Sequence, residues 1–381
     1  MLTDALKDYL DQQIQHQLYR QRAVVDGPQG VQLHIAGKSY INFCSNDYLG
    51  LANHPQVIEA LMQGAQRYGV GSGASHLING HSRAHHQLEE ELAEFVGRPR
   101  ALLFSTGYMA NLGVISALLG RGDAVFEDRL NHASLLDGGL LSQARLQRYQ
   151  HADGNDLQAK LSASKARQTL ICSDGVFSMD GDVAPLDALI KQAKLNQSWL
   201  MVDDAHGLGT IGEKGRGTLE VYGASLAQVP ILVGTLGKAF GTFGAFVAGD
   251  ENLIEYLIQR ARSYIYTTAL PPAVAEATRA SVRLMTEEAW RREQLRNNIH
   301  YFKKSLSQIG MADTGSDSAI QPIVLGEVAR AVALSEHLKQ QGILVSAIRP
   351  PTVPEGSARL RVTLCAEHSH AQIDQLLASL Q

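Results

Sequence analysis

A lysine in an apolar, glycine-rich segment offers the most specific chemistry in this sequence. Lys238 follows the apolar run ILVGTL, and four glycines lie within six residues of it. Poor solvation in such a segment favours the neutral amine, which can form a Schiff base with an aldehyde cofactor. A snorkelling surface lysine is the ordinary alternative, but it rarely needs so many glycines nearby. GTLGK is not a P-loop, because Leu232 and Ala239 replace the required Gly and Ser/Thr.

Asp203 and His206 follow the apolar run WLMV, at the expected carboxyl end of a strand. One use of such a pair is metal ligation, but no HxxxH or HxH motif nearby adds further ligands. His368 and His370 do form HxH, in a polar stretch where we expect a helix cap or a solvated turn. The other use fits Lys238: a buried carboxylate keeps a pyridine nitrogen protonated, so that the ring acts as an electron sink. An isolated Asp–His pair more often has a structural role, but the presence of Lys238 downstream favours a cofactor-binding role for Asp203 and His206.

Three further segments follow apolar runs and carry polar groups suited to a phosphorylated, planar cofactor. STGYMAN (105–111) follows RALLF and is expected to open a helix, whose first N–H groups bind phosphate. Tyr108 adds a hydroxyl there, His132 in NHAS could stack on a flat ring, and Ser178 in GVFSMDGD could donate a hydrogen bond. Each segment alone fits an ordinary turn or core histidine better. VGSGASHLING (70–80) lacks the third glycine of a dinucleotide fingerprint.

Helices and short apolar strands that alternate from Asn46 onward must position these groups. Such alternation predicts right-handed crossovers and a mainly parallel sheet, whose carboxyl edge holds the site. We expect helices at Pro55–Tyr68, His85–Val96, Leu112–Leu119 and Pro185–Lys194, and strands at RALLF, DAVFED, RLQRY, QTLICSD, WLMVDD and ILVGTL.

The two ends of the chain have a different pattern. An amphipathic helix is expected over the first 22 residues, followed by a hairpin of VQLHI and SYINF. A long charged helical stretch follows Pro272 up to about Gly310, and then strands IQPIVLG, ILVSAI and ARLRVTL with helices at Val328–Gln340 and His370–Leu380. We therefore predict an N-terminal helix and arm (1–44), a large cofactor-binding domain (45–275) and a smaller α+β domain (276–381).

Composition excludes several classes of function. The chain has 381 residues, 45% hydrophobic residues and a net charge of −4, which favours a folded protein without a surface for nucleic acid or acidic membranes. Its three cysteines fit no metal knuckle and are expected to be reduced. Ala101–Gly120 has no charged residue, but its polar residues and glycines indicate a buried strand and helix rather than a membrane span. We expect a soluble, cytoplasmic protein.

Taken in order, these residues resemble the pyridoxal-phosphate enzymes of the aspartate-aminotransferase-like fold, fold type I. Within that fold the chain resembles the α-oxoamine synthases. The resemblance rests on NFCSNDYLGL, FSTGYMANLG, NHASLLDG, GVFSMDGD, VDDAHG, GTLGKAFG, IYTTALPP and AIRPPTVPEGSARLRVTL, which together run from Asn42 to Leu364. The segment IRPPTVP is most similar to the biotin-pathway branch of the family. The chain departs from relatives at Asp174, commonly glutamate, and within 71–80 at Ala74, His76 and Leu77.

The resemblance implies a role for each matching residue. Lys238 would hold pyridoxal 5'-phosphate covalently, Asp203 would pair with the pyridine nitrogen, and His206 would pair with the ring oxygen. His132 would stack on the ring and contact the substrate. Further cofactor contacts would come from Gly107, Tyr108, Ser178, Thr235 and, across a homodimer interface, Thr267. Asn46 and Arg361 would bind the amino-acid carboxylate, and Arg20 and Thr352 the acyl substrate.

The implied reaction is a decarboxylative condensation of L-alanine with a pimeloyl thioester, carried on acyl carrier protein or coenzyme A. It would give an amino-oxo acid of biotin biosynthesis, carbon dioxide and the free carrier. Three alternatives stay open at this point: a sister synthase that uses glycine or serine, a non-catalytic homologue that binds a partner protein, and a metal-dependent hydrolase.

Overall fold

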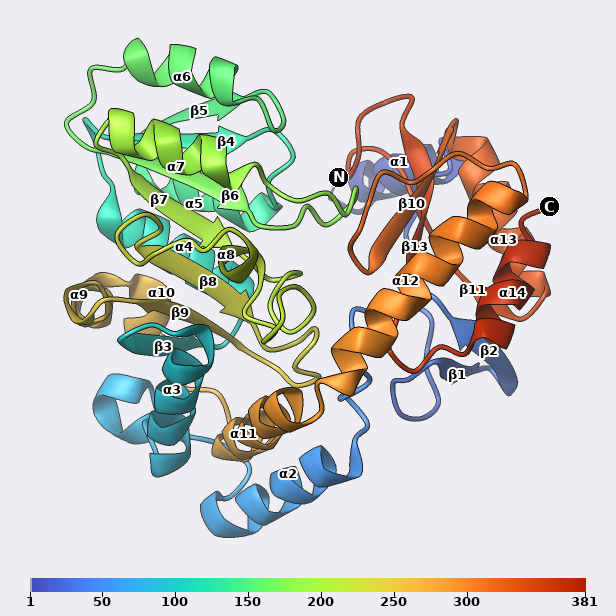
Figure 1. Cartoon of the computed structure of the whole chain (residues 1–381), viewed down its shortest axis with the longest axis horizontal. Helices are drawn as coiled ribbons and strands as arrows, with labels where there is room; N and C mark the ends of the chain where they lie inside the picture. Colours follow the sequence, from blue (N-terminus) through green and yellow to red (C-terminus); the bar gives the residue numbers. More distant parts are fainter. Residues whose placement is uncertain (1) are drawn as a thin grey trace. The chain divides into compact units, whose positions relative to one another are not determined.

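The computed structural model describes residues 2–381, which divide into two compact units (Figure 1). The larger unit comprises Leu51–Ser178 and Asp182–Arg292. The smaller unit comprises the chain up to Gly50, the short insertion Met179–Gly181, and Glu293–Gln381.

The larger unit is built on a seven-stranded sheet with the strand order β3-β9-β8-β7-β6-β4-β5. Only β9 runs against the others, so the predicted mainly parallel sheet is confirmed. The expectation did not include β9, because its apolar run lies between glycines beside Lys238. The strands are β3 (Arg100–Phe104), β4 (Ala124–Asp128), β5 (Arg145–Tyr149), β6 (Thr169–Asp174), β7 (Trp199–Asp203), β8 (Ile231–Thr235) and β9 (Ala245–Gly249).

Several helices of the larger unit connect successive parallel strands of its sheet. Ala101–Gly120 forms most of β3 and all of α4 with a largely buried run of side chains, as expected. No helix within residues 2–381 is both long and apolar enough to cross a membrane. The helices are α2 (Pro55–Tyr68), the π-helix η1 (His76–Gly80), α3 (Arg83–Val96), α4 (Gly107–Leu118), α5 (Ala133–Ser142), α6 (Gly154–Ser162), α7 (Leu186–Leu195), α8 (Thr218–Val221), α9 (Glu251–Arg260), α10 (Arg262–Ile265) and α11 (Pro272–Glu287).

The smaller unit holds two three-stranded sheets, β1-β2-β11 and β10-β13-β12. The predicted hairpin forms as β1 (Gln32–Ile35) and β2 (Lys38–Asn42), which pair antiparallel. Its C-terminal elements are β10 (Ile320–Gly326), α13 (Val328–Gln340), β11 (Ile343–Leu344), β12 (Ser346–Ile348), β13 (Ala358–Thr363) and α14 (His370–Ala378).

Three sequence-based expectations were wrong in detail. The N-terminal helix α1 (Leu2–Gln15) ends seven residues early, and its apolar residues Leu6 and Ile14 are exposed. The run ILVSAI is not one strand, because β11 and β12 belong to different sheets. The long helical stretch after Pro272 is two helices, α11 and α12 (Trp290–Gln308), interrupted at Glu288.

Candidate active site

The carboxyl ends of β6, β7 and β8 meet the N-termini of α4 and α5 around a cavity of about 170 Å³ in the larger unit. The parallel register aligns Asp174 with Asp203 on neighbouring strands, so both carboxylates reach the same edge of the sheet. Eight of the nine expected cofactor-binding residues line this cavity: Gly107, Tyr108, His132, Ser178, Asp203, His206, Thr235 and Lys238. The topology thus brings together groups that are up to 131 residues apart in the sequence.

Lys238 and His206 form the reactive pair of the cavity. The Lys238 Nζ atom lies 2.9 Å from Nε2 of His206. The histidine is buried at the end of the β7 strand, and the lysine lies just after β8 in the loop that leads to β9. Gly241 in that loop has a φ of +67°, and an added Cβ would lie 2.5 Å from the Ala52 backbone nitrogen. The loop is therefore held close to a neighbouring backbone, which fixes the position of Lys238.

Asp203 is a buried carboxylate with a fixed orientation. Its Oδ2 accepts a hydrogen bond from the Asn111 side-chain amide at 2.7 Å, and its Oδ1 accepts one from the Ala205 backbone N–H at 3.1 Å. Asn111 also donates to the Ser134 hydroxyl at 2.8 Å, while its own Oδ1 has no protein partner. Asn111 and Ser134 both line the cavity, and sequence reasoning missed them. Asn111 is the last residue of the segment STGYMAN. A polar side chain within an otherwise apolar helix was the sequence signal that could have identified it as a site residue.

Asp204, next to Asp203, bonds to the backbone of the fold and does not face the cavity. Its side chain is fully buried, and Oδ2 accepts the Thr218 backbone N–H at 2.6 Å. An added Cβ at Gly217 would lie 1.9 Å from this carboxylate, and one at Gly207 would lie 2.1 Å from it. Burial raises the pKa of Asp204 to about 7. Because strand alternation sends the two side chains to opposite faces, only Asp203 lines the cavity.

His132 lies at the N-terminus of α5 and is held through its backbone. Its N–H donates to Oδ2 of Asp174 at 2.9 Å, and its ring Nδ1 lies 2.7 Å from the Ser134 hydroxyl. Burial lowers the pKa of His132, and the nearby Lys238 lowers it further, against the opposing effect of Asp203. Burial and the Asp203 carboxylate raise the pKa of Asp174 well above its usual range. Asp174 thus accepts a hydrogen bond from the backbone that positions His132.

The N-terminus of α4 points its first N–H groups at the cavity. Thr106 caps the helix by accepting the Met109 N–H at 3.1 Å, so Gly107 and Tyr108 open the first turn. An added Cβ at Gly107 would meet nothing closer than 3.9 Å, so this glycine leaves the entrance to the turn open. The Tyr108 hydroxyl bonds to Asp137. The free N–H groups and the helix dipole make this turn suitable for a phosphate.

The remaining expected site residues lie elsewhere in the chain. Thr267 belongs to the larger unit but does not line the cavity. In the smaller unit, Asn46 Oδ1 accepts hydrogen bonds from both terminal nitrogens of Arg361 at 3.2 Å. Arg20 and Thr352 are exposed. Arg349 lies near both residues. Burial lowers the pKa of Arg349, and the positive charge of Arg20 lowers it further. The backbone carbonyl oxygen of Arg349 accepts the Thr352 N–H at 3.1 Å.

Comparison with known proteins places this geometry in a family. The profile of the aminotransferase class I and II family matches residues 38–380. The 8-amino-7-oxononanoate synthase of Nitrosococcus oceani is 64% identical over 363 residues, which cover 95% of this chain and 96% of that protein. That of Methylococcus capsulatus is 64% identical over 362 residues, covering 95% of this chain and 94% of that protein. The chain belongs to the 8-amino-7-oxononanoate synthase family.

Solved structures agree with this assignment. An 8-amino-7-oxononanoate synthase from Francisella tularensis matches with a TM-score of 0.78 at 35% identity, covering 90% of this chain and 96% of that one. A serine palmitoyltransferase from S. paucimobilis with a bound PLP–myriocin aldimine matches with a TM-score of 0.93 at 33% identity, over 99% of this chain and 96% of that one. The expected fold type I and the expected acyltransferase class are confirmed.

The cofactor of this synthase family, pyridoxal 5'-phosphate, fits the residues present. Its aldehyde requires an amine, which Lys238 supplies beside His206. Its ring nitrogen requires a buried acid, which Asp203 supplies, and the orphaned Asn111 Oδ1 in the cavity wall needs a polar partner. Its phosphate requires a cluster of N–H donors, which the first turn of α4 supplies.

Proposed function

We propose that this chain condenses L-alanine with a pimeloyl thioester to give 8-amino-7-oxononanoate, carbon dioxide and the free carrier, a step of biotin biosynthesis. The observation that carries the proposal is the meeting of Lys238, His206 and Asp203 in one cavity, in a chain 64% identical to 8-amino-7-oxononanoate synthases. Pyridoxal 5'-phosphate is the cofactor.

In this proposal, Lys238 would hold the cofactor covalently, and Asp203 would pair with its ring nitrogen. His206 would pair with the ring oxygen, and His132 would contact the ring. Thr235 and Ser178 contribute hydroxyl groups, and Gly107 and Tyr108 contribute the phosphate site. When bound, the cofactor stabilises negative charge that develops at the α-carbon of the amino acid.

The protein's own groups then divide the work of proton transfer and orientation. Lys238 Nζ would take the α-proton of alanine as a general base and would later return it. The nearby Nε2 of His206 limits where that amine can point. Asp203 would hold a proton at the ring nitrogen by a charge-assisted hydrogen bond, and Asn111 and Ala205 keep the carboxylate oriented for it.

We propose that Arg361 and Asn46 bind the alanine carboxylate. The guanidinium is buried and already aligned on the Asn46 amide oxygen, so it offers a rigid pair of donors. A fixed carboxylate selects which α-carbon bond reacts. We assign the pimeloyl group, which ends in a second carboxylate, to Arg20 and Thr352, with Arg349 as an additional cation beside them.

We further propose a cytoplasmic homodimer in which Thr267 reaches the cofactor phosphate of the neighbouring subunit. Either acyl carrier protein or coenzyme A then delivers the pimeloyl group. Light scattering of the purified protein tests the dimer. Replacement of Thr267 by alanine is expected to weaken cofactor binding without dissociating the subunits, and unchanged cofactor affinity would refute the role of Thr267.

The test of function is a matrix of substrates. Purified protein is mixed with L-alanine, glycine or L-serine and with pimeloyl-coenzyme A or pimeloyl-acyl carrier protein, and products are identified by mass spectrometry. We expect 8-amino-7-oxononanoate from L-alanine with at least one donor, and none from the Lys238→Ala variant. A product formed only from glycine or serine would identify a sister synthase instead. Cofactor-loaded protein that turns over none of these mixtures would indicate a non-catalytic homologue.

A further inference from the structure

Four histidines and a glutamate gather where the π-helix η1 meets the start of α3. His76 begins η1, His81 follows it, and His85, His86 and Glu89 lie in the first two turns of α3. None of them lines the cavity that holds Lys238. Four of the five, His76, His81, His86 and Glu89, line a separate cavity of about 280 Å³.

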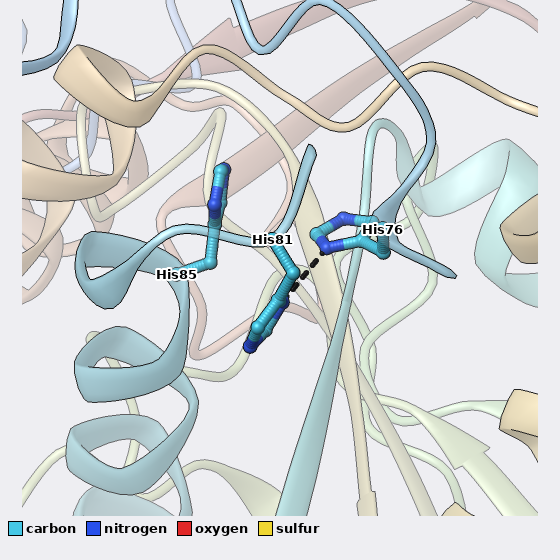
Figure 2. Close-up of side chains that lie close together, drawn as sticks. All are labelled: His76, His81 and His85. Carbon is cyan, nitrogen blue, oxygen red and sulfur yellow. Dashed lines mark hydrogen bonds between the residues drawn. The ribbon is translucent and has the colours of Figure 1, made fainter. Parts of the chain in front are cut away.

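The π turn is what brings the first two histidines together. His76 is the first residue of this single π-helical turn, and His81 is the residue that follows it, so the turn separates the two along the chain while keeping them close in space. Gly80 permits this tight turn, since an added Cβ would lie 2.1 Å from the carbonyl oxygen of Ala74. Figure 2 shows the rings of His76 and His81 turned toward each other, with His85 beside them on α3. Their Nδ1 atoms are 3.0 Å apart.

A 3.0 Å contact between two Nδ1 atoms requires one proton between them. When His81 is the donor, the lone pair of its Nε2 is available to a ligand. This is the usual arrangement of a metal-binding histidine, whose second ring nitrogen donates to a neighbouring acceptor.

His85 is already committed to the fold. Its Nδ1 accepts the Ser82 backbone N–H at 3.0 Å in the capping box of α3. Its Nε2 bonds to the carbonyl oxygen of Leu270 at 2.7 Å. Metal binding by His85 would break one of these bonds, so His85 serves the structure and the other histidines are the candidate ligands.

His86 and Glu89 supply the remaining donors. They lie three residues apart on one face of α3, and ligand atoms of His81, His86 and Glu89 all lie within 4.8 Å of one another. The side chain of His86 is 52% exposed and touches Glu90, so it can rotate to shorten these distances. Glu89 Oε1 accepts the Leu103 N–H at 2.9 Å, which leaves Oε2 for an ion.

We propose that His81, His86 and Glu89 bind one divalent transition-metal ion of the zinc class, with His76 orienting His81. Two imidazoles and one carboxylate are the donors that zinc accepts, and the adjoining cavity has room for water at the remaining position. The ion would tie the turn after η1 to the first two turns of α3. The proposal does not depend on the reaction catalysed at Lys238.

Calorimetry with Zn²⁺ on tag-free, EDTA-treated protein that retains its cofactor tests the site, and Co²⁺ absorption between about 500 and 700 nm reports the ligand geometry. We expect one ion per chain and a metal-dependent rise in Tm. His81→Gln and His86→Gln should each weaken binding at least about 10-fold, and His76→Gln by roughly 10- to 100-fold. Glu89→Gln keeps an acceptor for the Leu103 N–H, so its loss of affinity would report the charge rather than the fold.

His34→Gln, an exposed histidine on β1, is the matched control and should bind Zn²⁺ like the parent protein. Absence of stoichiometric binding in the parent protein would overturn the proposal. Equal affinity in the parent, His86→Gln and Glu89→Gln proteins would overturn it as well, because the ion would then lie elsewhere.

Discussion

The side-chain amide of Asn111 joins Oδ2 of Asp203 at 2.7 Å, across 92 residues of sequence. The amide comes from the second turn of α4, whose first turn offers the phosphate site, and the carboxylate comes from the end of β7. One helix would therefore serve both ends of the cofactor, because its first N–H groups would bind the phosphate and its Asn111 holds the acid that would pair with the ring.

Asn111→Ala is expected to lower kcat/KM by roughly 10- to 150-fold, equivalent to about 1.5–3 kcal/mol for a hydrogen bond to a charged group. The loss follows because Asp203 would keep only its bond from Ala205. The absorption spectrum of the bound cofactor, followed against pH, should shift at the same time. Asn155→Ala, an exposed asparagine on α6, is the control, and equal effects of the two substitutions would contradict a positioning role.

Asp203 and Asp204 are adjacent residues for which we expect opposite outcomes. Asp203→Asn should bind the cofactor but lose roughly 30- to 1000-fold in kcat, about 2–4 kcal/mol, because the ring nitrogen would no longer face a carboxylate. Asp204→Asn should lower Tm and leave the pH profile of kcat unchanged, because Asp204 binds the Thr218 backbone among close-packed glycines. Steady-state kinetics and thermal unfolding of both variants separate the roles. Near-normal turnover by Asp203→Asn would contradict the electron-sink assignment.

Lys238→Ala should abolish turnover and the covalent link to the cofactor. Borohydride reduction followed by peptide mass spectrometry should add the mass of the cofactor to the peptide that contains Lys238 in the parent protein only. Loss of a general base alone costs roughly 10²- to 10⁴-fold, and loss of the covalent tether adds to that cost. Lys214→Ala, at an exposed lysine, is the matched control. A labelled peptide elsewhere in the chain would refute the assignment.

Local sequence pattern predicted much of the fold because many elements have strong local signals. The proline at its start and the glycine after its end define α2 at Pro55–Tyr68, as expected. The β10 strand and the α13 helix also have the predicted bounds. The β9 strand was missed because the four residues between Gly244 and Gly249 carry little pattern, and its pairing with β3 joins segments far apart in the sequence.

Side chains with distant partners were the hardest to interpret from sequence. The segment His368–His370 was expected at a helix cap or a solvated turn; it does lie at a helix cap, but His368 is buried, with an exposed fraction of 2%. Its Nδ1 accepts the Cys365 N–H, and its Nε2 donates to the Asn42 carbonyl oxygen, 326 residues away. Ser369 is the residue that caps α14, and the neighbouring His370 stacks on Tyr301. A short motif such as HxH cannot reveal such long-range bonds, and Asn111 was missed for the same reason.

His151 links two carboxylates at the edge of the larger sheet, and this link predicts a pH-dependent stability. Its Nδ1 lies 2.9 Å from Asp128 Oδ1 and its Nε2 lies 2.8 Å from Asp182 Oδ2. The two carboxylates raise the pKa of His151 to about 10, against the opposing effect of burial. Below a pH of about 6.5 the histidine is charged in both the folded and the unfolded chain, so its contribution is complete. Between about 6.5 and 10 the unfolded chain loses the proton first, so the contribution falls as the pH rises.

His151→Gln should therefore lower the free energy of unfolding by about 1.5–3 kcal/mol at a pH of about 6, the range for hydrogen bonds to charged groups. The difference between the parent and variant proteins should shrink steadily as the pH approaches 10, because the parent protein loses its extra stability there. Urea unfolding at several pH values measures this difference, with the exposed His300→Gln as the control. A difference that grows with pH would have the wrong sign for a charged His151, and would mean that the ring bridges Asp128 and Asp182 in its neutral form.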